Sequence, residues 1–171
     1  YFTGFLTPFW QSPTRPWFTI VPASGKPVAV IPGIGAPSMR ETWIDDVRTW
    51  SSPQPDDDGI TLLADTVVEL AGTGARVGVP MGPETHMRMP LGDVDRLRGL
   101  LGEFTDVTDI IRGLRMVKSE REIAKHATIC SIVSDAFDRL PEIVGTGMSE
   151  RAAFQAFRAE ILAQGADDVP Y

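Results

Sequence analysis

The pattern of apolar residues changes once along this chain of 171 residues, near residue 114, and this change limits the folds it can adopt. Before that point, short apolar runs alternate with segments whose apolar residues recur at helical spacing, which is typical of an α/β domain. After it, the spacing is helical throughout. The sequence therefore predicts an α/β domain over residues 1–114 and a different, helical segment over residues 115–171.

The first segment predicts a mixed sheet with flanking helices. Residues 17–21 and 28–31 predict two strands joined by a turn, and residues 43–50 a third strand or edge segment. A loop rich in turn residues follows and leads into a helix, because apolar residues recur at helical spacing from Leu62 to Leu70. The β-α alternation continues through a strand at 76–79, a helix at 93–101, a strand at 103–107 and a helical turn at 110–114.

The second segment predicts two amphipathic helices. Ser119 and Glu122 form a capping box, which satisfies backbone N–H groups in the first turn of a helix. The apolar stripe of this helix consists of Ile123, Ala127, Cys130, Val133, Phe137 and Leu140. Ser149 is the expected N-cap of the next helix. Two helices alone do not form a closed hydrophobic core, so we expect this segment to be the beginning of another domain. We also expect the exposed apolar stripe to make the chain associate with other copies or fray.

Composition excludes several classes of partner. The formal net charge of −7 argues against nucleic-acid binding, which depends on clustered Lys and Arg. No apolar run is long enough to span a bilayer, so we expect no membrane partner. The single cysteine, Cys130, cannot form an internal disulfide. These features favour a soluble protein of a reducing compartment, with the cytoplasm as the default location.

Three motifs in a fixed order carry a family resemblance. They are Tyr1-Phe2-Thr3-Gly4-Phe5, then the stretch from Leu114 to Ile123 that opens the long helix, and then the stretch from Gly147 to Arg151 that opens the next one. In this order and spacing the chain resembles the creatinase, prolidase and aminopeptidase P superfamily of "pita-bread" enzymes. The resemblance runs along nearly the whole chain.

The resemblance implies an N-terminal α/β domain, a linker helix and a C-terminal α+β catalytic domain that holds two divalent metal ions on two Asp, one His and two Glu. Because the chain does not begin with methionine, we expect it to be an interior piece, with residues 1–114 lacking their own start and residues 115–171 giving a linker helix and a truncated catalytic domain. Asp167 and Asp168 are adjacent and do not match the spacing of the family's Asp pair. We therefore expect no catalytic residue and no metal ligand in this piece, which would itself be inactive.

The resemblance also implies a substrate-binding role for the loop that follows the first motif. In dimers of the superfamily a loop of one subunit's N-terminal domain reaches the active site of the other, and in creatinase-like members an aromatic residue and an arginine of this loop contact a carboxylate substrate. The corresponding candidates here are Phe9, Trp10, Arg15 and Trp17. Arg15 could clamp a carboxylate through two N–H groups. The alternative is that the aromatic residues pack against the sheet edge and that Arg15 is solvated.

Four other patterns favour structural roles. His126 and Cys130 are one helical turn apart, but Cys130 belongs to the apolar stripe, so we expect a buried, inert thiol. Glu84 and His86 share a loop and would make a poor metal site, so an interdomain or dimer contact is preferred. Asp56-Asp57-Asp58 are contiguous, unlike calcium ligands, and fit a helix N-terminus. Gly33-Ile34-Gly35 lacks the third glycine of a dinucleotide fingerprint.

Three hypotheses for function remain. The first is a metal-dependent Xaa-Pro peptidase, in which this piece orients a small peptide and forms a homodimer. The second is a non-peptidase relative that acts on a small carboxylate, such as a creatinase-like hydrolase or a dimethylsulfoniopropionate lyase, because aromatic faces beside an arginine suit a molecule that bears an onium charge and an acid. The third is a non-catalytic interaction protein of the same fold.

Overall fold

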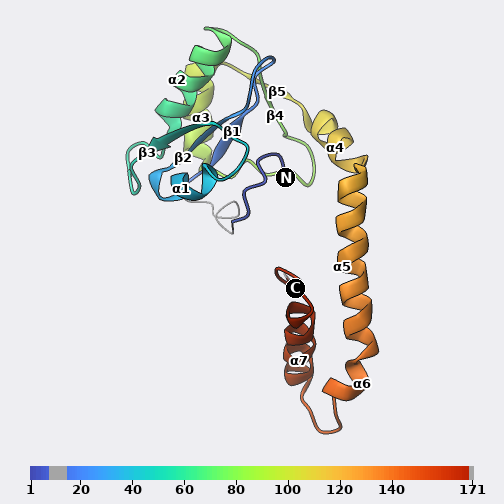
Figure 1. The fold of residues 1–171 in the computed structure, drawn as a ribbon. Helices are drawn as coiled ribbons and strands as arrows, with labels where there is room; N and C mark the ends of the chain where they lie inside the picture. The colour runs from blue at the N-terminus through green and yellow to red at the C-terminus, as the bar shows by residue number, and fades with distance from the viewer. Residues whose placement is uncertain (8–14, 170–171) are drawn as a thin grey trace. The chain divides into compact units, whose positions relative to one another are not determined.

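The computed structural model describes residues 1–7 and 15–169 (Figure 1). The chain divides into two compact units, Tyr1–Ile111 and Arg112–Tyr171. The first unit is α/β and the second is helical. Helix α4 (Thr108–Met116) contains the division between them.

A three-stranded mixed sheet forms the centre of the first unit. Strand β1 (Phe18–Ile20) pairs with β2 (Val28–Pro32) in antiparallel orientation, which confirms the predicted hairpin. Strand β3 (Asp46–Trp50) pairs with the other side of β2 in parallel orientation. All five residues of β2 are buried. This burial explains why β2 reads as a continuous apolar run and not as an alternating one.

Two short helical segments that the sequence pattern did not reveal connect β2 to β3. They are the 3-10 turn η2 (Gly33–Gly35) and α1 (Ala36–Met39). Pro37 occupies the first turn of α1, where its missing N–H costs nothing. Each segment is shorter than the window in which helical periodicity can be recognised, so the sequence showed only the glycines.

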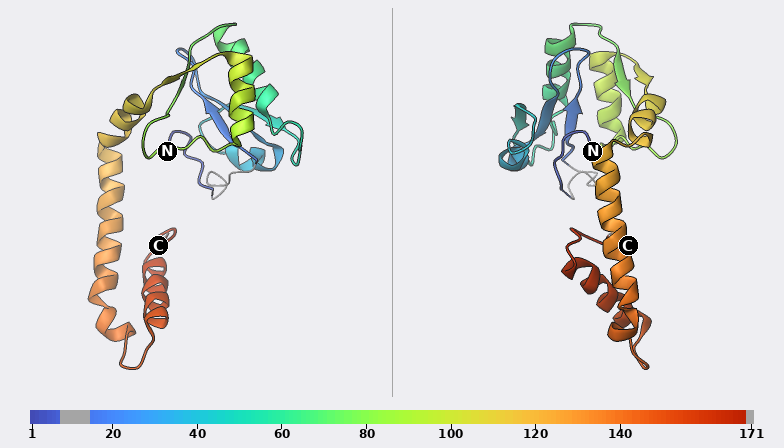
Figure 2. Two further views of the ribbon diagram at one scale, coloured as in Figure 1. Left: turned by 180° about the vertical axis from the view of Figure 1, so that it is seen from behind. Right: turned by 45° about the vertical axis from the view of Figure 1, so that its right-hand side comes forward.

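A second, two-stranded sheet pairs β4 (Val77–Val79) with β5 (Phe104–Asp106) in parallel orientation. Helix α2 (Ile60–Ala71) leads into β4, and α3 (Leu91–Leu101) connects β4 to β5. This is the β-α-β alternation that the sequence predicts. The green and yellow-green helices of Figure 2, α2 and α3, lie side by side, and both contribute to one core.

Two apolar clusters hold the first unit together. The larger joins the three-stranded sheet to α2 and α3 through Val30, Trp50, Ile60, Leu63, Ala64, Val67, Met89 and Leu97. The smaller lies under η2 and α1 and contains Ala29, Ile31, Met39 and Ile44. Because successive residues of a strand point to opposite faces, Val30 enters the larger cluster while Ala29 and Ile31 enter the smaller one.

An ion pair fastens the C-terminal end of α2 to β3, and a carboxylate caps its N-terminal end. Arg48 of β3 binds both carboxylate oxygens of Glu69, at 2.5 and 2.8 Å, and also pairs with Asp46 at 2.9 Å. The hydrogen bonds from Arg48 lower the pKa of Glu69. At the other end, the Asp57 carboxylate accepts from the backbone N–H groups of Ile60 at 2.8 Å and Thr61 at 3.1 Å. The acidic stretch therefore caps a helix, as expected.

The second unit begins its long helix at the predicted capping box. In α5 (Glu120–Asp138), the Ser119 hydroxyl accepts from the Glu122 N–H at 3.3 Å, and the Glu122 carboxylate accepts from the Ser119 N–H at 2.8 Å. The short helix α6 (Leu140–Ile143) follows, with Pro141 in its first turn. Ser149 caps α7 (Glu150–Ala163) by accepting from the Ala152 N–H at 3.2 Å.

Burial in α5 is concentrated near its C-terminal end. Ala136 is fully buried, and the ring of Phe137 lies 4.7 Å from the ring of Phe157 in α7. Ile123 and Cys130, further toward the start of the stripe, are exposed. The expectation that the Cys130 thiol is buried was therefore wrong, because α6 and α7 pack only against the far end of α5. None of the helices in the described part of the chain combines the length and the apolarity needed to cross a bilayer.

Candidate functional site

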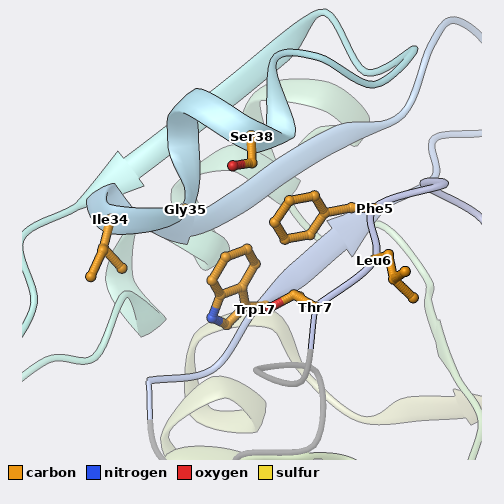
Figure 3. A pocket seen from close by; sticks show the side chains of 7 residues that line it. All are labelled: Phe5, Leu6, Thr7, Trp17, Ile34, Gly35 and Ser38. Atoms are coloured by element: carbon orange, nitrogen blue, oxygen red, sulfur yellow. The ribbon is translucent and has the colours of Figure 1, made fainter. Parts of the chain in front are cut away.

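An open cleft of about 210 Å³ lies beside the three-stranded sheet (Figure 3). Its walls come from three parts of the first unit: the N-terminal segment, the residue that precedes β1, and the turn between β2 and α1. The lining residues are Phe5, Leu6, Thr7, Trp17, Ile34, Gly35 and Ser38. The cleft thus brings residues together that lie up to 33 positions apart in the sequence.

The stacked rings of Phe5 and Trp17 form the aromatic wall of the cleft (Figure 3). Their centroids are 5.2 Å apart and their planes are inclined by 14°. Both rings pack against the smaller apolar cluster of the unit, so the core holds them in place. The Trp17 ring also lies so close to the turn at Gly35 that a Cβ atom there would overlap with it. Glycine at position 35 is therefore required by the position of Trp17.

Hydrogen bonds fix the N-terminal motif that carries Phe5. The buried Thr3 hydroxyl accepts from the Phe5 N–H at 3.1 Å, and Gly4 between them has a φ of +72°. That left-handed conformation is one that glycine adopts without a steric penalty. The Trp43 indole donates to the Phe2 carbonyl oxygen at 3.1 Å. These contacts give a physical reason for Thr-Gly before an aromatic residue in this motif.

The cleft has the composition of a binding surface and not of a catalytic centre. Among the described lining residues, Thr7 and Ser38 have hydroxyl groups, Trp17 has an indole N–H, and none carries a charge. Ile34 and Leu6 are largely exposed, by 70% and 84%. Side chains of this kind can bind an apolar group and donate or accept a hydrogen bond, but they offer no general acid or base.

The structure describes two of the four predicted substrate-binding residues, Arg15 and Trp17. Trp17 lines the cleft, as described. Arg15 is exposed, has a φ of 56° and is absent from the described lining of the cleft. Phe9 and Trp10 belong to residues 8–14, which lie outside the described part of the chain.

Sequence reasoning missed most of the cleft. Leu6, Thr7, Ile34 and Ser38 belong to no chemical motif, and Gly35 drew attention only as part of a failed nucleotide fingerprint. The sequence offered one signal for these missed residues, which was Phe5 of the Thr-Gly-Phe motif. A large aromatic side chain usually packs against another apolar group. That partner, Trp17, could not be identified without the fold.

A second polar cluster lies at the carboxyl ends of β4 and β5, where parallel strands often present functional side chains. The buried Thr108 hydroxyl accepts from the N–H groups of Met81 at 2.9 Å and Gly82 at 2.7 Å, and it donates to Asp106 at 2.5 Å. Asp106 also accepts from the Met81 N–H at 3.1 Å. These groups satisfy one another, so the cluster fixes the loop after β4 and has a structural role.

The remaining candidates of the sequence do not converge on a site. Glu84 and His86 are exposed on the loop after β4, and His126 and Cys130 are exposed on α5. Within residues 1–7 and 15–169, no three His, Cys, Asp or Glu side chains come together as metal ligands would. The described residues therefore do not fit the pair of divalent metal ions that the superfamily resemblance implies.

Sequence comparison relates this chain to peptidases. A family model described as the Creatinase/Prolidase N-terminal domain matches residues 1–117. The probable dipeptidase PepE of Mycobacterium tuberculosis is 26% identical over 152 residues, which are 89% of this chain and 39% of the relative. The same identity and coverage hold for the Mycobacterium bovis protein of that name. The chain thus spans about two fifths of the length of the curated relatives it matches.

Solved structures of similar fold belong to the same group of proteins. Dipeptidase PepE from Mycobacterium ulcerans matches with 28% identity and a TM-score of 0.64, over 91% of this chain and 40% of its own. The X-Pro aminopeptidase from Thermotoga maritima matches with 22% identity and a TM-score of 0.74, over 100% of this chain and 42% of its own. A prolidase from Thermococcus sibiricus gives a TM-score of 0.73 at 23% identity, over 91% of this chain and 40% of its own.

Proposed function

Because the chain belongs to the Creatinase/Prolidase N-terminal domain family, we propose that it is the substrate-orienting and dimer-forming part of an Xaa-Pro peptidase. The observation that carries this proposal is the cleft with a rigid aromatic wall and no catalytic group among its described lining residues. Such a surface positions a substrate for chemistry performed elsewhere. The names of the similar dipeptidases, prolidases and X-Pro aminopeptidase support a small peptide as the substrate.

In this proposal Arg15 and Trp17 bind different parts of the substrate. Arg15 is exposed and is only two residues from Trp17, so their Cα atoms are at most about 7 Å apart. The guanidinium group of Arg15 would bind the carboxylate of the peptide, and the ring of Trp17 would contact an apolar part of it. Both contacts fix the orientation of the peptide and leave its scissile bond to other residues.

The proposed peptidase uses catalytic metal ions, but the described residues include no group of side chains that could bind them. The superfamily resemblance implies two divalent ions, which supply an activated water for hydrolysis when bound. We place their ligands in a longer chain that would contain this one. A homodimer, in which this domain contributes to the partner's site, and a cytoplasmic location complete the proposal.

A second candidate function follows from the same aromatic wall. Aromatic faces attract cations, and an arginine two residues away could bind an acid. A small molecule with an onium group and a carboxylate would use both, as in a creatinase-like hydrolase or a dimethylsulfoniopropionate lyase. A non-catalytic relative would use neither.

The test is an assay of the full-length protein against a panel of substrates. The panel contains Xaa-Pro dipeptides, the same dipeptides with the residues in reversed order, creatine and dimethylsulfoniopropionate. We expect hydrolysis of the Xaa-Pro dipeptides. Turnover of creatine or dimethylsulfoniopropionate alone would favour the second candidate, and no turnover with any divalent metal added would favour the non-catalytic relative.

The role of Arg15 is tested in the same assay. Replacement Arg15→Ala should lower kcat/KM by about tenfold or more, because a charge-assisted contact to the carboxylate is lost. The matched control is Arg76→Ala, which removes another exposed arginine of the same unit. Equal kinetics for Arg15→Ala and the control would remove Arg15 from the substrate site.

A further inference from the structure

The short segment Arg15-Pro16-Trp17 presents an exposed cation next to a buried ring. Resting on the proposed function, in which Arg15 binds the carboxylate of the peptide, we propose that Pro16 is a positioning residue. It holds the backbone at Arg15 in the conformation that directs the guanidinium group toward this carboxylate. The backbone of Arg15, the burial of Pro16 and the contacts of Trp17 each support this assignment.

Arg15 has a backbone conformation that is unfavourable for a residue with a side chain. Its φ of 56° lies in the left-handed region, which glycine adopts freely and most other residues avoid. The side chain is exposed and forms no ion pair with any residue in the ranges 1–7 and 15–169, so such a pair does not account for the conformation. Strained residues of this kind are concentrated at binding and active sites, where the surrounding structure holds them in place.

Pro16 limits the backbone on both sides of the Arg15–Pro16 peptide bond. The proline ring fixes its own φ at about −65°, and it also restricts the conformations of the residue before it. The side chain of Pro16 is less than 2% exposed, so the surrounding protein holds the ring. A backbone rotation that turned Arg15 away would therefore have to move a buried ring.

Trp17 anchors the other end of the segment. Its ring stacks on Phe5 with the centroids 5.2 Å apart, and it lies against the turn at Gly35, where there is no room for a Cβ atom. The two residues that follow Arg15 are thus fixed by packing, while Arg15 itself is exposed. A guanidinium group on a preordered backbone loses less conformational freedom when it binds a carboxylate.

The experiment combines Pro16→Ala with Arg15→Ala in the full-length protein and measures KM and kcat separately for an Xaa-Pro dipeptide. We expect Pro16→Ala to raise KM at least about fivefold and to leave kcat within about twofold, because a misplaced binding group weakens substrate binding. In the Arg15→Ala protein the same substitution should change KM less than about twofold, since the group that Pro16 positions is then absent. A role of Pro16 in stability alone would not depend on Arg15 in this way.

The matched control is Pro27→Ala, which removes a half-buried proline from the turn between β1 and β2 and should leave KM within about twofold. A second variant, Pro16→Val, keeps more of the buried apolar volume and should raise KM as Pro16→Ala does. Circular dichroism establishes that each variant is folded. The proposal is overturned if the Pro16 variants raise KM as much without Arg15 as with it, or if neither of them folds.

Failure of this proposal can be distinguished from failure of the proposed function. If the full-length protein hydrolyses Xaa-Pro dipeptides but Pro16→Ala behaves as Pro27→Ala does, the positioning role is refuted and the proposed function stands. If no Xaa-Pro dipeptide is hydrolysed, the proposed function fails and the positioning role fails with it.

Discussion

Gly35 controls the position of the aromatic wall at the scale of a single residue. A Cβ atom at this position would overlap the Trp17 ring, which also packs against the smaller apolar cluster. We therefore expect Gly35→Ala to destabilise the protein by about 1–3 kcal/mol, the usual cost of forcing an extra group into a packed site. Chemical denaturation of the two proteins measures this difference.

The neighbouring glycine of the same turn provides the control. A Cβ atom at Gly33 would lie 3.6 Å from the Trp50 carbonyl oxygen, which is an ordinary contact distance. Gly33→Ala should therefore change the free energy of unfolding much less than Gly35→Ala. Equal effects of the two substitutions would mean that the loss of glycine flexibility, and not the Trp17 ring, determines stability here.

Sequence reasoning reached the site only in part at this scale. It selected Trp17 from the loop after the first motif, and it gave no reason to consider Ser38 or Ile34. Those residues line the cleft because η2 and α1 bring them beside Trp17, and this placement depends on how the strands pair. The sequence shows the chemistry of each side chain, but it does not show which side chains become its neighbours in the fold.

At the scale of elements, the start of α2 should make stability depend on pH. Partial burial of Asp57 opposes its ionisation, but hydrogen bonds from Thr61 and Ile60 and the charge of Arg96 outweigh this effect. The pKa of Asp57 therefore lies below its ordinary value of 3.8. A carboxylate with a lowered pKa stabilises the folded state above its unfolded pKa, and this contribution is lost as the pH falls through the folded pKa.

Asp57→Ala tests this contribution. At pH 7 it should cost about 1 kcal/mol, as the loss of a helix cap does, and the difference from the unmodified protein should shrink as the pH falls below about 4. Thermal melts between pH 3 and pH 7 provide the measurement. The control Asp56→Ala removes an exposed carboxylate of the same loop and should change the stability less. If the loss of stability caused by Asp57→Ala did not vary with pH, the charge of Asp57 would have no role in it.

The sequence predicted correctly those elements that a short motif determines, such as a turn or a helix cap. The hairpin of β1 and β2, the Ser119–Glu122 capping box and the Ser149 cap are all present. The pairing of β4 with β5 in a sheet separate from β1–β3 could not be read from the sequence, because every strand offers the same backbone hydrogen bonds. The prediction that Cys130 is buried was wrong. An apolar stripe shows which face of a helix packs against other elements, but it does not show how much of that face they cover.

At the scale of the whole molecule, the helical unit leaves much apolar surface exposed. Val117 is 80% exposed and Ile123 is 57% exposed. We expect the 171-residue chain on its own to associate or to fray in this unit, since exposed apolar surface of this kind seeks a partner. Sedimentation velocity at several concentrations, together with a thermal melt, measures both effects; a monomer with a single cooperative transition would contradict the expectation.

The order of strands along the chain has a consequence for biosynthesis. Both ladders of the three-stranded sheet lie within residues 18–50, so the sheet can close as soon as this stretch has left the ribosome. The larger core cluster also contains Leu97, which is made 47 residues after Trp50. During translation the nascent domain therefore passes through a stage in which its sheet is paired while the Trp50 side of the sheet still awaits α3, and this is the stage at which a chaperone would find an apolar surface to bind.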